Sequence, residues 1–157
     1  MVFPERVYTI DEVRKARELV EKGYKHCLRV KGSKEFRQKV KKALQLIKTA
    51  GYRDFFRTYI RQISEIDGFS QLRTEEVAIW ANKYTVAESV DAASYFIHKA
   101  QQMKDFLDGR LYYDKGELNA IKKRIQFIEA LREKTRNQEI KQRCEKLLKE
   151  WSETPFP

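Results

Sequence analysis

Hydrophobic residues recur three and four positions apart in several stretches of the chain, which is the spacing of one buried helix face. The first stretch follows Thr9 and Glu12, a pair that forms a capping box, and it ends at Gly23. A second helix is expected after Ser33, a favourable N-cap residue, and before Gly51. The apolar face of this second helix consists of Phe36, Val40, Ala43, Leu44 and Ile47.

The same spacing continues beyond Gly51, where aromatic residues broaden the apolar face of a helix over residues 52–63. This helix and the one before it are expected to form a helical hairpin. Ser89 is the expected N-cap of the next helix, which ends near Gly109. Two further helices, over residues 117–134 and 137–152, close the chain.

Two segments between these helices have the pattern of strands. Residues 24–31 alternate, with Leu28 and Val30 on one side, and residues 72–86 are rich in Thr, Val, Ile, Trp and Tyr. Strands between helices without a regular alternation predict an α+β fold, mostly helical with a small β-sheet, and an all-α fold is the alternative. The length of 157 residues is that of a single domain, residues 1–157.

The composition excludes several classes of protein. No apolar run approaches the roughly 20 residues that span a bilayer, and the first residues lack the order of a signal peptide. We therefore expect a cytoplasmic protein with no membrane partner. Cys27 and Cys144 form no CxxC pair, which argues against a disulfide framework and a Cys-based zinc site. No P-loop, GxGxxG or GxSxG motif occurs, and no cofactor is expected.

The excess positive charge is concentrated in one part of the chain. Residues 22–61 contain 13 Lys or Arg and two acidic residues, whereas the rest of the chain has 20 basic and 21 acidic residues. On the two helices of this part, the aligned cations are Lys34, Arg37, Lys41 and Lys48, followed by Arg53, Arg57 and Arg61. Like charges at helical spacing repel by a few tenths of a kcal/mol per pair, so an anionic partner such as phosphate would relieve this repulsion.

These seven cations are the candidate anion-binding residues, and their expected partner is nucleic acid or another polyanion. No zinc-finger spacing, RNP pattern or helix-turn-helix accompanies them, so specific base recognition is not supported. One alternative is a solvated face that serves only solubility or stability. Another is that carboxylates of the carboxyl-terminal helices, such as Glu139, Glu145 or Glu150, pair with the arginines.

A second region of interest is the helix that begins near Ser89. Its polar stripe consists of Asp91, Ser94, His98, Gln102 and Asp105, with Tyr95 at the border. A lone histidine on a polar helix face is most often a surface residue. The functional alternative is an enzyme that uses His98 with Asp105, Tyr95 or Glu117.

Beyond this helix, Arg110, Tyr112 and Tyr113 could bind an anion or stack on a base, although such aromatic pairs are more often packing anchors.

Residues 92–131, AASYFIHKAQQMKDFLDGRLYYDKGELNAIKKRIQFIEAL, resemble the active-site region of small zinc metallopeptidases of the gluzincin type. In that family a helix with the motif HExxH is followed by a loop containing Gly and Tyr and by a second helix bearing Glu. Residues 31–63, KGSKEFRQKVKKALQLIKTAGYRDFFRTYIRQI, similarly resemble the leading strand and helix pair of the family. The resemblance implies a zincin-like fold, with the His98 helix against a small sheet and a cleft closed by the Glu117 helix.

The chain departs from this family at the residues that carry the chemistry. The motif position reads HKAQQ, so His98 retains the first ligand position, Lys99 replaces the general base and Gln102 replaces the second histidine. An amide is a weak zinc ligand and an ammonium group cannot accept a proton from water at neutral pH. For the downstream ligand the register gives Asn119, with Glu117 two residues before it.

The resemblance and its departures predict a noncatalytic binding or interaction protein with a degenerate, metallopeptidase-like fold. Its expected cleft contains Tyr95, His98, Gln102, Glu117 and Asn119. We expect no catalytic residues and no tightly bound zinc, and a protein partner is compatible with this function. The alternative is a basic protein that binds nucleic acid or another polyanion through residues 22–61.

Overall fold

The structure is a computed structural model that describes residues 2–109 and 116–153. It confirms the expected α+β fold, since helices pack against one small sheet, and it excludes the all-α alternative. The helices of the described residues are α1 (Ile10–Glu21), α2 (Lys34–Thr49), α3 (Arg53–Tyr59), α4 (Ser89–Leu107), α5 (Glu117–Lys134) and α6 (Gln138–Glu153). The strands are β1 (Arg29–Lys31), β2 (Gln62–Glu65), β3 (Gln71–Arg73) and β4 (Ala78–Ala81), with a short 3-10 helix at Thr74–Glu76.

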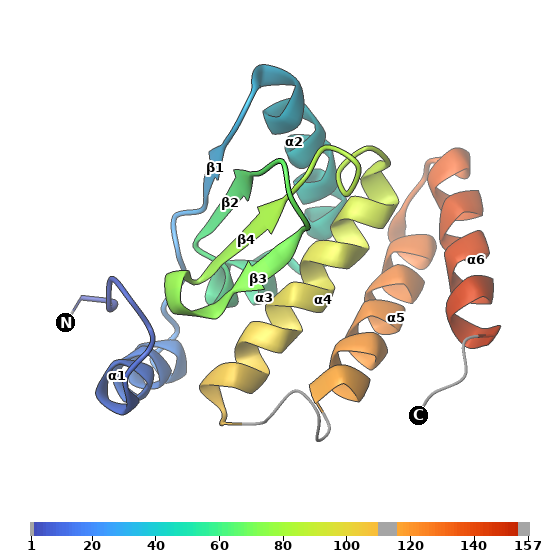
Figure 1. Cartoon of the computed structure of the whole chain (residues 1–157). Coiled ribbons are helices and arrows are strands. Elements are labelled where there is room, and N and C mark those ends of the chain that lie inside the picture. Colours follow the sequence, from blue (N-terminus) through green and yellow to red (C-terminus); the bar gives the residue numbers. More distant parts are fainter. Residues whose placement is uncertain (1, 110–115, 154–157) are drawn as a thin grey trace.

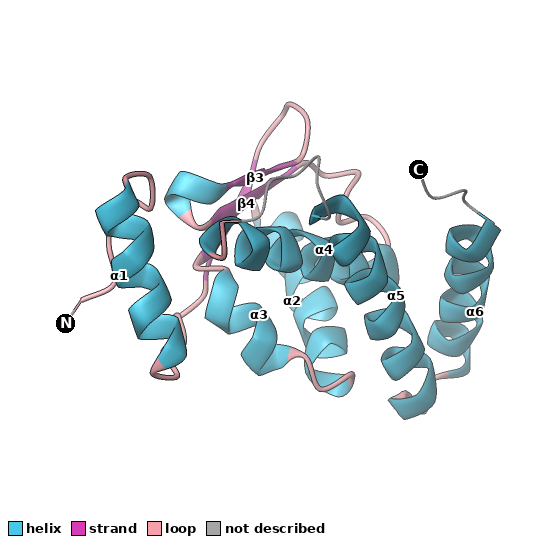
Figure 2. Ribbon diagram, turned by 90° about the horizontal axis from the view of Figure 1, so that it is seen from below, coloured by secondary structure: helices cyan, strands magenta, loops and turns pink. Residues whose placement is uncertain are grey.

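The sheet has the strand order β1-β2-β4-β3, in which β1, β2 and β4 are parallel and β3 is antiparallel to β4. Val30, Ile63 and Ile79 stand side by side across the three parallel strands. Figure 1 shows α2 and α3 behind the sheet, and Figure 2 shows the helices on one side of the strands. Strand β1 therefore forms one edge of the sheet and β3 the other.

Helix α4 lies at the centre of the molecule, between the helices behind the sheet and the pair α5 and α6 (Figure 1). Its apolar side contributes Phe96, Ile97 and Met103 to the core, all with 0% exposure. Its polar side is also covered, because α5 packs along it. None of the helices in the described part of the chain combines the length and the apolar character needed to cross a membrane.

Local signals placed several helix ends correctly. Thr9 and Glu12 form the expected capping box of α1, and the Ser33 hydroxyl accepts a hydrogen bond from the Phe36 amide at the start of α2. Gly51 has a φ of 83°, in the left-handed region that favours glycine. This turn ends α2 and leads directly into α3, so the end of one helix and the start of the next lie close together.

Other boundaries differ from the predictions. The strand expected over residues 24–31 is limited to Arg29–Lys31. The helix expected over residues 52–63 ends at Tyr59, and Ile60 is already extended, so α3 is too short for the expected helical hairpin. Pairing of Ile63 with both β1 and β4 outweighs the local helical pattern. The N-cap of α4 is Glu88 rather than Ser89.

Candidate functional site

Three of the sequence-predicted cleft residues meet where α4 faces the start of α5. The Gln102 side-chain amide donates a hydrogen bond to Glu117 Oε2 at 3.2 Å. His98, one turn earlier on α4, has its Nε2 3.7 Å from Glu117 Oε1. Glu117 is the first residue of α5, and it therefore faces two positions of α4 at once.

Lys99 occupies the remaining side of the Gln102 amide. Its Nζ donates a hydrogen bond to Gln102 Oε1 at 3.1 Å and lies 5.3 Å from the centre of the Tyr95 ring. Burial lowers the pKa of Lys99, and the Glu117 carboxylate opposes that shift. The Gln102 amide is thus engaged at both its oxygen and its nitrogen, and it links Lys99 to Glu117.

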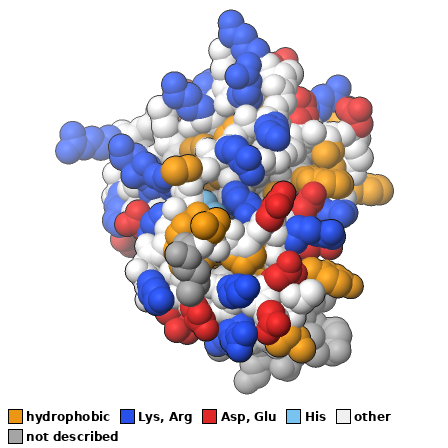
Figure 3. All heavy atoms as spheres, turned by 90° about the vertical axis from the view of Figure 1, so that its left-hand side faces the viewer, with side chains coloured by type: hydrophobic (Ala, Val, Ile, Leu, Met, Phe, Trp, Pro, Cys, Tyr) orange, Lys and Arg blue, Asp and Glu red, His pale blue; other side chains and the backbone are white. Residues whose placement is uncertain are grey.

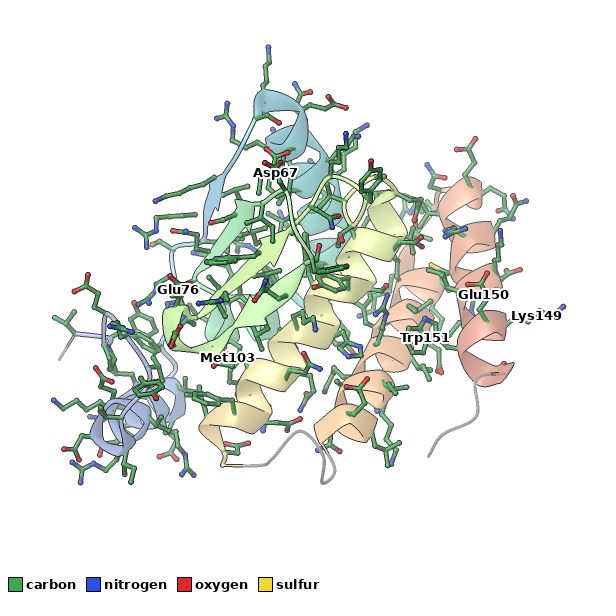
Figure 4. All side chains as sticks on the ribbon, viewed as in Figure 1. Asp67, Glu76, Met103, Lys149, Glu150 and Trp151 are labelled. Atoms are coloured by element: carbon green, nitrogen blue, oxygen red, sulfur yellow. The ribbon has the colours of Figure 1, made fainter. Side chains whose placement is uncertain are left out.

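A second cation, Arg124 of α5, completes this network. Its Nε donates to Ser94 Oγ of α4 at 3.2 Å, and its guanidinium lies 4.6 Å from the Trp151 ring centre. Burial lowers the pKa of Arg124 to about 10. Figure 4 shows Trp151 on the side of α6 that faces α5, whereas Lys149 points away. The polar stripe of α4 is therefore an interface with α5 and α6.

His98 is buried rather than on the surface, with 6% exposure, so the surface interpretation was wrong. Burial lowers its pKa to about 3, and the positive charges of Arg124 and Lys99 act in the same direction. His98 is consequently neutral at pH 7, and its 3.7 Å contact with Glu117 is not an ion pair. Within the described residues, His98 Nδ1 has no hydrogen-bond partner.

The structure separates the remaining candidates of this cleft. Tyr95 borders the network through Lys99, and burial raises the pKa of its hydroxyl to about 12. Asn119 is half-buried on α5 and makes no side-chain hydrogen bond with any described residue. Glu117, two residues before Asn119, is the side chain that reaches α4. Arg110, Tyr112 and Tyr113 lie outside the described residues.

Sequence reasoning missed Arg124 and Trp151 as parts of this network. Arg124 follows Glu117 by seven residues, which places both on one face of α5 and was a usable signal. Trp151 had no such signal, because it comes from a helix whose packing the sequence does not specify.

The donor set does not suit a zinc ion. Catalytic zinc sites use three protein ligands drawn from His, Cys and carboxylates. Among the described residues, no group of three or more such side chains is placed to hold a metal. His98 and Glu117 supply two, while Lys99 and Arg124 add positive charge beside them. The network instead has the properties of a polar contact that holds α4 and α5 together.

A second candidate site is a groove of about 450 Å³ where β1, α2 and α3 meet. Its cations are Lys41 and Lys48 from α2 and Arg53 and Arg57 from α3. The left-handed turn at Gly51 explains how the two helices bring these side chains to one place. Four of the seven predicted anion-binding residues are thus brought together by the fold.

The other three predicted cations lie elsewhere. Lys34 and Arg37 are exposed near the start of α2, outside the groove lining. Arg61 follows the end of α3, so the expected row of three arginines was wrong. Its guanidinium donates to the backbone carbonyls of Pro4 at 2.9 Å, Glu5 at 2.7 Å and Glu76 at 3.0 Å. Arg61 therefore attaches the amino-terminal segment to the sheet.

The groove cations are not neutralised by carboxylates. No ion pair within 4.0 Å involves Lys41, Lys48, Arg53 or Arg57 in the part of the chain that the structure describes. Helix α6 packs against α5 and lies away from α2 and α3 (Figure 1). The expected alternative, in which carboxylates of α6 pair with the arginines of the groove, was therefore wrong. Arg57 Nε donates to the His26 carbonyl at 2.9 Å, which fixes that guanidinium at the groove.

Comparison of the chain with models of protein families, with curated proteins and with solved structures found no match. The resemblance to gluzincins therefore stays a prediction from sequence pattern.

Proposed function

We propose that this protein is a noncatalytic binding protein with a degenerate, metallopeptidase-like fold. The observation that supports the proposal best is the Gln102 amide, which bridges Lys99 and Glu117 at the position of the zinc-binding motif. In a zinc peptidase the residues at these positions hold the metal and activate water. Here the same positions form contacts between two helices.

The chemistry of these side chains supports the absence of peptidase activity. Peptide hydrolysis at this position would need a carboxylate beside His98 as the proton acceptor, and the chain has the amine of Lys99 there instead. Burial lowers the pKa of Lys99, and the Glu117 carboxylate opposes that shift. Glu117 is the only carboxylate that contacts His98 among the described residues, and it already accepts a hydrogen bond from Gln102. With a pKa of about 3, His98 is too weak a base to activate water at pH 7, and Glu117 Oε2 already accepts the Gln102 hydrogen bond.

Zinc binding by the purified protein tests this proposal. We expect equilibrium dialysis to find no stoichiometric zinc on the natural protein at pH 7. The double substitution Lys99→Glu with Gln102→His should create a site for one zinc per chain, because the new imidazole would stand beside His98 and Glu117. A matched control is Gln38→His with Lys42→Glu on the exposed side of α2, which should gain none.

One result would overturn the proposal. If the natural protein held one zinc per chain, lost that zinc on His98→Ala and cleaved peptides, the α4–α5 network would be a working metal centre.

The second candidate function is polyanion binding through the basic residues of α2 and α3. The specific observation that favours it is the group of four groove cations without an ion pair among the described residues. Binding to duplex DNA should then weaken with salt, with log K falling by roughly 0.9 per phosphate contact per decade. Arg53→Glu with Arg57→Glu should flatten this slope. If that variant lost stability without any change in binding, this function would be excluded.

A further inference from the structure

Strand β1 is an edge of the sheet with one side open. It is the first strand in the order β1-β2-β4-β3, and β2 is the only described strand that pairs with it. The Arg29 amide donates to the Arg61 carbonyl at 3.0 Å, which directs the backbone of Arg29 toward β2. In a parallel ladder, alternate residues direct their backbone groups to opposite sides. The N–H and C=O groups of Val30 therefore point away from β2.

The groove begins at this open edge. Leu28 and Val30 line it from the β1 side, and Leu44, Ile47 and Phe56 line it from α2 and α3. Ile47 and Phe56 are each 1% exposed, so they form a closed floor beneath partly exposed walls. A strand added to β1 would direct every second side chain to one face of the sheet. The apolar walls would accept such side chains.

The charge of the groove is of one sign. Among the described residues, its lining contains four cations and no carboxylate. Figure 3, which views the molecule from the β1 side, shows Lys and Arg side chains gathered around apolar surface on its upper part. Several cations spread along a groove match several separate negative charges better than a single headgroup does. A partner with repeated carboxylates fits this arrangement.

The residues that line the groove favour a protein partner over a nucleic acid. Proteins that bind single strands without base reading stack the bases on exposed aromatic rings. The only aromatic residue among those that line the groove is Phe56, which is buried in its floor. The other apolar residues are aliphatic, and aliphatic walls suit apolar side chains.

We propose that the groove binds an extended, acidic segment of a partner protein, which adds as a strand to β1 and directs every second side chain, some apolar and some acidic, into the space between β1, α2 and α3. This inference rests on the proposed function as a binding protein and names the chemistry of the partner. The backbone of Val30 would supply the pairing. Among the side chains that face the groove, the apolar ones would contact its walls and the carboxylates would pair with its four cations.

The first experiment measures the binding of labelled peptides by fluorescence anisotropy. The probe is a peptide of about eight residues in which every second residue is Ser and the positions between them are Val and Glu in turn, so that Val and Glu lie on the same face of the added strand. It is called the Glu–Val peptide. Three controls separate the contributions: a Glu-only peptide lacks the apolar side chains, a Lys–Val peptide reverses the charge, and a peptide with Pro in place of each Val cannot donate to β1 from those positions. We expect the Glu–Val peptide to bind at least about tenfold more tightly than each control.

Variants of the protein test the same site. Arg53→Glu with Arg57→Glu should weaken binding of the Glu–Val peptide by about tenfold or more, and Leu44→Gln should weaken it without changing the net charge. The matched control is Lys146→Glu with Lys149→Glu on α6, which changes the net charge equally on exposed residues away from the groove. This control should bind like the natural protein.

Cys27 provides an independent readout of occupancy. It lines the groove and is exposed, whereas the other cysteine, Cys144, is buried and burial raises its pKa to about 11. Iodoacetamide should therefore modify Cys27 first. Saturating Glu–Val peptide should slow this modification, and the Lys–Val peptide should not.

The outcomes distinguish this inference from the proposed function. If single-stranded DNA or polyphosphate bound more tightly than the peptide and the arginine substitutions abolished that binding, the acidic protein partner would be wrong while a binding function stood. If no anion bound and Cys27 reacted equally in all samples, the groove would not be a binding site. Bound zinc with peptidase activity would overturn the proposed function independently.

Discussion

His26 and His98 are the two histidines of the chain, and both are held neutral by their surroundings. His26 is 1% exposed and packs edge-on against the rings of Phe3 and Tyr24, at 4.5 and 5.0 Å. Burial lowers its pKa to about 4, with a further contribution from Arg61. Burial lowers the pKa of His98 to about 3, with contributions from Arg124 and Lys99. Each imidazole therefore stabilises the fold only in its uncharged form.

This burial predicts a loss of stability in mild acid. At pH 7 both histidines are mostly neutral in the folded and the unfolded chain. As the pH falls below about 6.5, the unfolded chain takes up a proton at each histidine, whereas the folded chain does so only near pH 3 to 4. The free energy of unfolding should fall by up to about 1.4 kcal/mol per pH unit for each histidine. Urea denaturation at pH 7, 6 and 5 measures this slope.

Substitution of one histidine at a time assigns the effect. The slope of unfolding free energy against pH measures how many protons the chain takes up on unfolding. His98→Gln should lower this number by up to one, and His26→Gln should do the same. Both variants should be less stable at pH 7, since each replaces a packed ring. A slope that is unchanged in both variants would show that neither histidine is responsible.

At the scale of the elements, the start of α4 depends on a side chain that precedes the expected cap. The Glu88 carboxylate accepts hydrogen bonds from the amides of Val90 at 3.1 Å and Asp91 at 2.7 Å. The positive end of the helix dipole also stabilises a carboxylate at this position. Burial raises the pKa of Glu88, and the two amide hydrogen bonds oppose that shift. Glu88 therefore supplies the cap that Ser89 was expected to supply.

Replacing each residue with alanine distinguishes the two caps. Glu88→Ala should lower the free energy of unfolding by about 1 kcal/mol, because two helix amides lose their acceptor. Ser89→Ala should change it by less than about 0.5 kcal/mol. Thermal and urea denaturation of both variants measure the difference. Equal losses, or a larger loss for Ser89→Ala, would contradict the assignment of the cap.

At the scale of the whole molecule, a polar contact of Arg143 attaches α6 to α4. Arg143 donates from Nε to Asp91 Oδ1 at 3.0 Å and forms a second hydrogen bond to the same carboxylate. It also lies 3.5 Å from Glu88 Oε2. Cys144 and Leu147 supply the buried apolar side of α6. The two-pronged contact between Arg143 and Asp91 thus links the last helix to the central one.

Breaking this contact should loosen α6 more than the rest of the fold. Arg143→Ala should cost about 1 to 2 kcal/mol, since a paired guanidinium and carboxylate are lost at a partly buried position. Hydrogen exchange should become faster in residues 138–153 while β2 and β4 keep their protection. Arg136→Ala, at an exposed position without an ion pair among the described residues, is the matched control. An equal increase in exchange across the chain would contradict this local attachment.

The sequence by itself determined the features that depend on neighbouring residues. The capping box of Thr9 and Glu12, the cap at Ser33 and the bounds of α5 follow from short-range hydrogen bonds and helical periodicity, which need no distant partner. The concentration of cations in residues 22–61 is likewise a property of composition. The resemblance of residues 92–131 to gluzincins also pointed to His98, Gln102 and Glu117, and the fold brings these side chains together.

Only the tertiary structure decided the features that depend on segments far apart in the chain. Ile63 became a strand residue because β1 and β4 pair with it on both sides, although its local pattern was helical. Arg61 does not lie in a row with Arg53 and Arg57, because backbone carbonyls from distant parts of the chain accept its hydrogen bonds. His98 became a neutral, buried group because α5 and α6 cover the polar side of α4. Burial and long-range pairing outweigh local preference wherever they exclude water from a side chain.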